Sequence, residues 1–499
     1  MARGRLINFG IVLQIIGILL IIEGVFIATS IPFSVYYGCP DNLIFSLSNP
    51  KAYFWPLLIS SVIATGTGLI LLFAFGRNVK KVIGKREGYL IVTFSWIIIS
   101  LFGALPFILG NAIPSYTDAF FETMSGYTTT GASILVDIEA MPKGLLFWRS
   151  MTHWIGGMGI IVLSLAILPF LGIGGMQLFI AEVPGPTPDK LHPRITSTAK
   201  RLWLIYVLLT GAETLLLMLG GMDLFDGLCH AFGTMATGGF STKNTSIAGY
   251  SPYIQYVITI FMVLAGTNFT LHYLAMHGKI KEVIRNEEFK WYLSIIAIAT
   301  LTCIIVLAIL KNNTLESIIR NSLFTVVSII TTTGFVTEDY LLWPVSLWFV
   351  VLLLMFVGGS AGSTGGGIKV VRHLLLLKNS KLEMKRLMHP QAILPVRMDG
   401  KPVSSFIIYN VLAFFLIYVM IFIMGSLVMS LMGLDFETSI GSVVSTLGNI
   451  GPGFGNVGPV NNFANIPWLG KWVLSFLMLL GRLELFTVLI LFSPSFWKK

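Results

Sequence analysis

Charged residues are scarce in this sequence. Only 11% of its 499 residues are Asp, Glu, Lys or Arg, whereas 55% are hydrophobic. A soluble chain of this length needs a more charged surface, so the composition indicates a polytopic membrane protein. Cysteine is also rare. Cys39, Cys229 and Cys303 follow no motif spacing, which argues against a disulfide framework or a structural zinc site.

Enzyme signatures are missing as well. The sequence contains no nucleophile elbow, no HExxH and no nucleotide-binding fingerprint. We therefore expect no enzymatic activity and no cofactor in this chain. The net charge of +10 could point to nucleic acid, but the basic residues crowd short loops between apolar runs, as Arg77, Lys80 and Lys81 do. That is the positive-inside pattern of membrane proteins, so we expect a lipid bilayer and no nucleic acid as partner.

Ten apolar runs are long enough to cross a bilayer. They lie near 8–30, 54–76, 89–110, 147–170, 202–221, 254–275, 291–310, 344–376, 404–432 and 467–492. No small-x-small cleavage site follows the first run, so we expect it to be a membrane helix and not a removed signal peptide.

Loop charge predicts the orientation of the chain. The loops assigned to the inside include 77–88, 171–201, 276–290 and 369–401, and the last holds eight Lys or Arg against two acids. The outer segment 111–146 is acid-leaning. We therefore expect both termini in the cytoplasm.

Four connections assigned to the outside hold a segment too apolar for a solvated loop and too short to span. These segments are 117–128, 225–236, 320–331 and 437–448. A half-length helix that enters the membrane and returns accounts for them, because non-helical backbone is tolerated there where it lines a cavity. Each segment leads into a tetrapeptide with glycine at its third place. The four are Thr129-Thr130-Gly131-Ala132, Thr237-Gly238-Gly239-Phe240, Thr332-Thr333-Gly334-Phe335 and Asn449-Ile450-Gly451-Pro452.

The four glycines also set a common register. Thirteen residues before them stand residue types favoured near helix starts, namely Asp118, Asp226, Asn321 and Thr438. Six residues before them stand small residues suited to close helix packing, namely Ser125, Gly233, Ser328 and Ser445. The chain is thus predicted as an all-α protein with ten transmembrane helices and four re-entrant pore helices. A two-helix prefix (1–88) precedes four helix–pore–helix (M1-P-M2) repeats with pseudo-fourfold symmetry, at 89–175, 200–280, 289–380 and 403–499.

These loops resemble the Trk/Ktr/HKT superfamily of potassium transporters, and the whole chain is most similar to its TrkH-type pore-forming subunits. The matching strings are TTTGAS at 128–133, ATGGFST at 236–242, TTTGF at 331–335, GNIGPGFG at 448–455, GGSAGSTGGGIK at 358–369 and GRLELFTVLILFSPSFW at 481–497. The resemblance implies a K⁺-channel-like pore in one polypeptide, a homodimer with one pore per subunit, and a prokaryotic inner membrane. It also implies regulation by a TrkA-type cytosolic subunit that binds nucleotides, for which the basic loop 369–401 is a plausible contact.

The tetrapeptides are predicted to form an ion-selectivity filter. Glycine at the third place adopts φ > 0, so successive carbonyls can point to one axis and replace the water shell of a cation. The expected K⁺ ligands are the backbone carbonyls of Thr130, Gly238, Thr333 and Ile450. A serine in the first loop marks sodium-preferring plant relatives, and glycine in all four loops favours K⁺. Loop four, Asn449-Ile450-Gly451-Pro452, departs most from the TTG pattern.

Two features are candidates for the gate. The run from Pro344 to Val357 rises only roughly 21 Å against a core of about 30 Å. Six glycines in ten residues follow it, and such a stretch disfavours helix; they are Gly358, Gly359, Gly362, Gly365, Gly366 and Gly367. The resemblance makes 358–367 an intramembrane gate loop, and the alternative is a lipid-facing kink. Arg482, in an apolar final helix, is implied to be a barrier to cations in the pore; the alternative is a structural ion pair. Glu484 is expected to project elsewhere.

Acids at the outer mouth, such as Glu122, Asp137 and Glu139, either concentrate cations or are ordinary solvated carboxylates. The predicted function is K⁺ uptake across the cell membrane, with K⁺ as the transported ion. The alternatives are a Na⁺-permeable or cation-coupled symporter of the same superfamily, and, less in keeping with four like repeats, an organic-solute carrier.

Overall fold

The protein is almost wholly helical. The structure, a computed structural model, describes residues 7–38, 54–76, 83–157, 159, 195–310 and 314–498. Its helices are α1 (Phe9–Ala28), α2 (Ile31–Gly38), α3 (Phe54–Gly76), α4 (Lys85–Gly103), α5 (Leu105–Leu109), α6 (Tyr116–Tyr127), α7 (Lys143–Gly157), α10 (Ile195–Leu219), α11 (Leu224–Met235), α12 (Pro252–Ala265), α13 (Phe269–Met276), α14 (Ile280–Arg285), α15 (Glu287–Leu310), α16 (Leu315–Ile330), η3 (Tyr340–Leu342), α17 (Val345–Met355), α18 (Val370–Met388), α19 (Ser405–Leu431), α20 (Phe436–Gly448), η4 (Gly455–Val457), α21 (Trp468–Arg482), α22 (Phe486–Leu489), η5 (Ile490–Phe492) and α23 (Pro494–Trp497). One antiparallel hairpin pairs β1 (Arg397–Met398) with β2 (Lys401–Pro402).

The expected mostly helical chain with many apolar helices is confirmed. In the described residues, six helical stretches are long and apolar enough to cross a bilayer, or eight if two bent pairs each count as one span. The count of ten spans stays a prediction. The second half of the fourth span (147–170) and most of the inner loop 171–201 fall in residues 160–194, which lie outside the described part of the chain.

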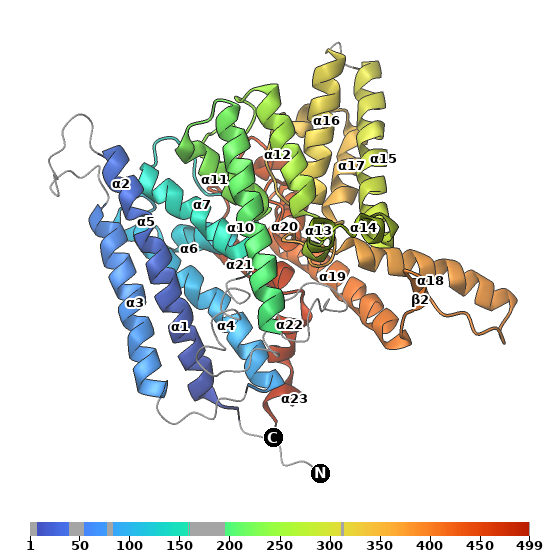
Figure 1. The fold of residues 1–499 in the computed structure, drawn as a ribbon, viewed down its shortest axis with the longest axis horizontal. Coiled ribbons are helices and arrows are strands. Elements are labelled where there is room, and N and C mark those ends of the chain that lie inside the picture. Colours follow the sequence, from blue (N-terminus) through green and yellow to red (C-terminus); the bar gives the residue numbers. More distant parts are fainter. Residues whose placement is uncertain are drawn as a thin grey trace.

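Small residues let the two long prefix helices pack closely. α1 and α3 lie side by side along one edge of the molecule (Figure 1). A Cβ added to Gly68 would come within 2.5 Å of the Gly17 carbonyl oxygen, and the Ser61 hydroxyl donates to the Gly24 carbonyl at 2.7 Å. Such close backbone contact is typical of helix pairs in membranes. The short helix α2 also belongs to this prefix.

Four helices (α6, α11, α16 and α20) precede the glycine tetrapeptides, and each begins with a capping side chain. The caps, each accepting from the backbone N–H three residues on, are Ser115 (3.4 Å), Asp223 (2.7 Å), Thr314 (3.4 Å) and Asp435 (3.1 Å). Three of these caps accept from the backbone N–H of a residue that the register singled out, namely Asp118, Asp226 or Thr438. These three residues therefore stand at helix starts, as predicted. The prediction was wrong for Asn321. Because Thr314 supplies the cap, α16 begins at Leu315 and Asn321 lies inside the helix.

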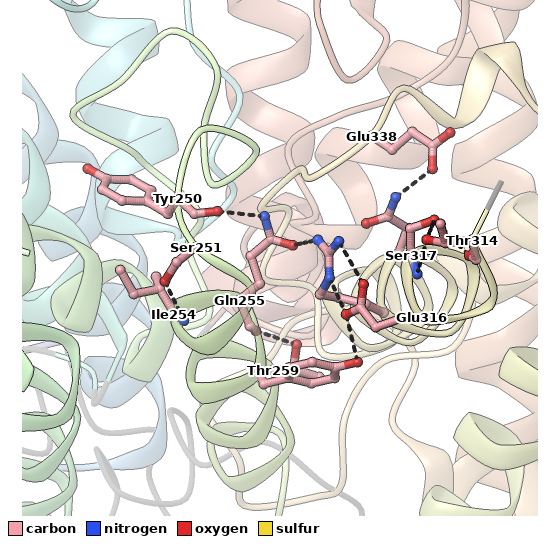
Figure 2. A network of polar contacts seen from close by, with 12 residues as sticks. Tyr250, Ser251, Ile254, Gln255, Thr259, Thr314, Glu316, Ser317 and Glu338 are labelled. Carbon is pink, nitrogen blue, oxygen red and sulfur yellow. Dashed lines mark hydrogen bonds and ion pairs between the residues drawn. The ribbon is translucent and has the colours of Figure 1, made fainter. Parts of the chain in front are cut away.

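A polar network secures the N-terminal half of α16 against α12 (Figure 2). Gln255 donates to the Tyr250 carbonyl at 3.1 Å and accepts from Arg320. Arg320 also pairs with Glu316 at 2.8 Å, and Asn321 donates to Glu338 at 2.9 Å. The network therefore ties the longest of the four helices to its neighbour, at the end far from the glycine loop.

Two predicted spans are sharply bent. The run 254–275 is not one helix. α12 ends at Ala265 with Gly266 as its C-cap, and Asn268 caps α13 with its side chain at 2.8 Å from the Thr270 nitrogen. The two helix axes differ by 100°. The final helix ends at Arg482, and a 111° bend follows. Glu484 and Leu485 reverse the chain there, with φ of 55° and 51°.

The eighth predicted run is interrupted, as its glycines indicate. α17 has 11 residues, which rise about 17 Å. Residues 356–369 follow without helix, and α18 then begins after Lys369. The expected inner loop 369–401 is consequently not a loop: most of it is α18, and the β1–β2 hairpin closes it. Part of the expected loop 276–290 is likewise helical, as α14.

Candidate ion-selectivity filter and gate

The helices α6, α11, α16 and α20 end in the same hydrogen-bonded cap. The first tetrapeptide residue has left-handed backbone, with φ of 53° at Thr129, 55° at Thr237, 56° at Thr332 and 54° at Asn449. Its N–H donates to the carbonyl three residues earlier, and the next N–H donates to the carbonyl five residues earlier. This pair of bonds is the Schellman cap, in which glycine or asparagine usually takes the left-handed place. Threonine at three of these places is strained, and such strain persists where the surroundings impose it.

The small residues six before each glycine accept the longer of these bonds. The distances from the second tetrapeptide nitrogen are 2.9 Å to Ser125, 2.8 Å to Gly233, 2.9 Å to Ser328 and 2.9 Å to Ser445. Two of the serines also use their hydroxyls, which the packing argument did not foresee. Ser328 donates to the Phe335 carbonyl at 2.7 Å, and Ser445 donates to the Gly451 carbonyl. These bonds hold loops three and four from behind.

The third-place glycines meet the neighbouring loops in a closed ring. All four have positive φ: 80° at Gly131, 79° at Gly239, 80° at Gly334 and 98° at Gly451. A Cβ on each would lie closer than 3.0 Å to one carbonyl oxygen of the next loop; the pairs are Gly131 with Gly238, Gly239 with Thr333, Gly334 with Ile450, and Gly451 with Thr130. The loops therefore follow one another in chain order around an axis. The structure brings together the four carbonyl groups that the sequence singled out.

Loop four adopts the same backbone as the others despite its different sequence. Asn449 suits the left-handed position because its short polar side chain tolerates it. Its side-chain amide donates to the Thr130 hydroxyl at 3.0 Å and to the Met478 carbonyl at 2.9 Å. Asparagine thus links the last loop to the first and closes the ring.

A cavity of about 180 Å³ lies directly on this ring, and all four third-place glycines line it. The three acids expected at the outer mouth differ in burial, and none of them is among the residues that line this cavity. Asp137 and Glu139 are partly or fully exposed and accept from Asn244 at 2.9 Å and 3.3 Å. The hydrogen bond from Asn244 lowers the pKa of Asp137. Glu122 is buried and pairs with Arg149 at 2.7 Å. The interpretation of Glu122 as an ordinary solvated carboxylate was therefore wrong, and an influence on cations at the mouth stays a prediction.

The glycine-rich segment 358–367 is buried beneath the ring and held by hydrogen bonds. Gly366 donates its N–H to the Thr332 hydroxyl at 2.7 Å, and Thr364 donates its hydroxyl to the Met235 carbonyl at 3.0 Å. Four other glycines of the segment also form hydrogen bonds. The Gly358 N–H donates to the Ile368 carbonyl at 2.9 Å, and the carbonyls of Gly359, Gly362 and Gly365 accept from the Val370 nitrogen (3.2 Å), the Phe269 nitrogen (3.0 Å) and the Lys369 Nζ. Gly367 has left-handed backbone, with φ of 65°. The segment thus contacts the third filter loop at Thr332 and the end of α11, the helix that leads into the second loop.

Arg482 lies at the same level, at the end of α21. Its guanidinium donates to the Thr364 carbonyl at 2.7 Å and to the Thr129 hydroxyl at 3.2 Å. It also donates to the Gly157 carbonyl at 2.9 Å. Arg482 therefore joins the base of the first filter loop to the glycine-rich segment. Glu484 projects elsewhere, as expected, and pairs with Arg372 of α18.

The sequence did not predict three sets of contacts. Two are ion pairs, Glu122–Arg149 and Glu484–Arg372. The third is made by the Glu288 carboxylate, which accepts from the Ala361 and Val371 nitrogens at 2.7 Å and 3.2 Å. One signal was available, because Arg149 stands in the apolar run 147–170 and a charge in such a run calls for a partner. The partner itself lies 27 residues away.

The chain is mostly helical, has many apolar helices, and brings backbone carbonyls together around one axis. These features are those of a membrane transport protein. The family model TrkH, described as "Cation transport protein", matches residues 60–499. The chain belongs to this family and is a transporter, not an enzyme.

Named relatives and a solved structure agree with this assignment. The chain is 45% identical to "Trk system potassium uptake protein TrkH" of Escherichia coli (strain K12), covering 85% of this chain and 88% of the relative. It is 39% identical to the protein of that name from Halomonas elongata, covering 98% and 99%. The crystal structure of the potassium transporter TrkH from Vibrio parahaemolyticus matches with a TM-score of 0.85 at 35% identity, covering 99% of this chain and 100% of the other.

Proposed function

We propose that this chain takes up K⁺ across a bacterial inner membrane through the ring of carbonyls from Thr130, Gly238, Thr333 and Ile450. The observation that carries the proposal is the closed sequence of glycine–carbonyl contacts around the four loops. Carbonyl oxygens set around an axis can replace the hydration shell of a K⁺ ion. The names of the relatives, potassium uptake proteins of Trk systems, support K⁺ as the ion.

Glycine in all four loops favours K⁺ over Na⁺. Any side chain at these positions would collide with a carbonyl of the neighbouring loop, and the positive φ would add strain. The ring therefore keeps its spacing only with four glycines. The four helices end at the ring, and the negative ends of their dipoles favour a cation there.

Segment 358–367 acts as the gate, and Arg482 acts as a positive barrier at its edge. The segment closes the path below the ring by its bonds to Thr332 and to the Met235 carbonyl. K⁺ passes when these few bonds break and the segment moves aside. Its six glycines lower the steric cost of that movement.

The remaining assignments follow from charge pattern and family. The chain has ten spans, of which two form the prefix and eight belong to the four repeats. Each repeat also holds one re-entrant helix, and both termini lie in the cytoplasm. It works as a homodimer with a TrkA-type cytosolic subunit that binds nucleotides. The basic helix α18 and the β1–β2 hairpin carry most of the inner charge of 369–401, and they form the contact with that subunit.

The proposal is tested by complementing a bacterial strain that lacks K⁺ uptake. The wild-type chain should restore growth at low K⁺, and Gly334→Ser should abolish that growth or make it sensitive to Na⁺, because the added side chain meets the Ile450 carbonyl. The matched control is Gly278→Ser, at a glycine with open space around it and φ of 75°, which should restore growth. The proposal would be refuted if growth at low K⁺ were the same with and without the protein, and the same again with Gly334→Ser.

A further inference from the structure

A buried ion pair lies behind two of the four filter loops. Glu122 is on α6, nine residues before Gly131, and Arg149 is on α7. The carboxylate is 2.7 Å from the guanidinium, and the side chains are 1% and 2% exposed. Two charges so thoroughly removed from water carry a desolvation cost of several kcal/mol each. Such a pair is therefore poorly explained as a contribution to stability.

Glu122 holds the first loop just beyond its glycine. Its carboxylate accepts from the Ser133 hydroxyl at 2.9 Å and from the Ile134 nitrogen at 2.8 Å. Together with the bond from Arg149, these contacts occupy both carboxylate oxygens. The segment that leaves the filter after Gly131 is thus fixed to the helix that leads into it.

Arg149 reaches from the same pair to the second loop. Its Nη1 donates to the Ser241 carbonyl at 3.0 Å, and its guanidinium lies 3.5 Å from the centre of the Phe240 ring. Ser241 follows Gly239 by two residues, as Ser133 follows Gly131. One ion pair therefore spans the equivalent points of two adjacent loops.

The other loops use neutral groups for the same purpose. The residues nine before the other glycines are His230, Thr325 and Ser442. His230 contacts the Ser241 hydroxyl at 2.9 Å and so reinforces loop two. Loops three and four are held instead by the hydroxyls of Ser328 and Ser445. The ion pair is thus no general requirement of the repeat.

The pair also has an electrostatic consequence. Arg149 is among the residues that line the cavity on the filter ring, so its charge lies close to the path of an incoming cation. Glu122 cancels that charge at a distance of 2.7 Å. Without the carboxylate, an unbalanced guanidinium would lower the local concentration of cations at the mouth.

We propose that the Glu122–Arg149 pair positions filter loops one and two relative to each other and neutralises the guanidinium at the outer mouth. Ion discrimination and K⁺ affinity then depend on this pair through two separable effects, geometry and charge. The proposal rests on the filter function proposed above. Both residues are positioning residues, because neither is expected to touch the ion.

Three variants separate the two effects in proteoliposomes that take up a radioactive Rb⁺ tracer. Glu122→Gln keeps the size but leaves Arg149 unbalanced, so KM for K⁺ should rise about tenfold and the preference for K⁺ over Na⁺ should fall. Arg149→Lys keeps the charge, but a lysine lacks the planar fork that spans Glu122 and Ser241. It should keep KM within about twofold of wild type, since charge balance sets the local cation concentration, and lose discrimination. The double variant Glu122→Gln with Arg149→Gln should restore KM but not discrimination.

The control removes an ion pair at the surface, in which Glu316 is 54% exposed. Glu316→Gln breaks the Glu316–Arg320 pair of Figure 2, which does not contact the filter loops, and it should change neither quantity. Wild-type KM and discrimination in folded Glu122→Gln would overturn the proposal. If that variant does not fold, Arg149→Lys with unchanged discrimination would overturn it. Unchanged discrimination in Gly334→Ser would instead contradict the filter itself, so the two failures are distinguishable.

Discussion

Two threonine side chains at the first place of the tetrapeptides contact the glycine-rich segment 358–367 and Arg482. The left-handed backbone at Thr129 and Thr332 turns their hydroxyls toward groups below the ring. Thr332 accepts from the Gly366 nitrogen, and Thr129 accepts from Arg482. The strain of a β-branched residue in this conformation is thus associated with a link between filter and gate.

Thr332→Val should loosen the gate. Valine has nearly the same shape but offers no acceptor, so the buried Gly366 N–H loses its partner at a cost of about 1–3 kcal/mol. Tracer flux through the purified chain, with no other protein added, should rise several-fold, because fewer hydrogen bonds then hold 358–367 beneath the ring. Thr332→Ser keeps the hydroxyl and is the control, with flux near that of wild type. Equal flux in the valine and wild-type proteins would count against this link.

Arg482→Ala should also raise K⁺ or Rb⁺ flux. The substitution removes a positive charge beside the path and frees the Thr364 carbonyl from its hydrogen bond. Arg482→Lys retains the charge, so its flux should lie between that of the alanine variant and that of wild type. Flux measured in purified protein decides the point, and unchanged flux in the alanine variant would rule out a barrier role.

Sequence regularity pointed to the four glycine tetrapeptides but not to the buried groups that contact them. The glycines could be found because four copies share one register with the helices before them. Glu122 looked like a mouth acid because nothing near it in sequence is basic. Its partner Arg149 lies on another helix, and only folding brings the two together.

At the scale of elements, capped starts define the helices that lead into the filter. Asp435 caps α20 by accepting from the Thr438 nitrogen at 3.1 Å. The hydrogen bonds from Thr438 lower the pKa of Asp435. The stabilisation from this cap is therefore present above the carboxyl's ordinary pKa and is lost as pH falls through the lowered value.

Asp435→Ala should destabilise the protein by about 1 kcal/mol at neutral pH, because the first turn of α20 loses its acceptor. Asp435→Asn is the matched variant, since asparagine caps helices nearly as well and cannot titrate. In thermal unfolding in detergent, the wild type and Asp435→Asn should have similar melting temperatures, and that of Asp435→Ala should be lower. A melting temperature for alanine equal to that of wild type would contradict the cap.

Glu288 connects the gate segment to the start of α15. Its carboxylate accepts backbone N–H groups from Ala361 and Val371, on either side of the last gate glycines. Glu288→Ala should raise basal flux several-fold, because two buried charge-assisted bonds of about 1.5–3 kcal/mol each are lost. Glu288→Gln keeps an acceptor oxygen and should have a smaller effect. Tracer flux through the purified chain alone distinguishes the three proteins, and equal flux in all three would exclude this role.

Breaks in the elements were predictable where composition changes. The end of α17 was foreseen because six glycines follow it within ten residues. The 100° bend between α12 and α13 was not foreseen, because apolar residues continue across it. Its local signals are single residues, Gly266 at the end of one helix and Asn268 as cap of the next.

At the scale of the whole molecule, contacts between distant repeats hold the ring closed. Asn449 of the fourth loop donates to Thr130 of the first. Lys471 of α21 pairs with Asp118 of α6 at 2.5 Å. The repeat could be predicted from spacing in the chain, but these closing contacts could not, since they join residues more than 300 positions apart.

The central claim is that four carbonyls coordinate the transported ion. The most direct measurement is an experimental structure of the protein in Rb⁺ or Tl⁺, with the ion located by its anomalous scattering. The account predicts an ion peak on the axis, at coordinating distance from the carbonyl oxygens of Thr130, Gly238, Thr333 and Ile450, and no such peak in Gly334→Ser. A transport-competent protein with its ion bound elsewhere, and none at this ring, would contradict it.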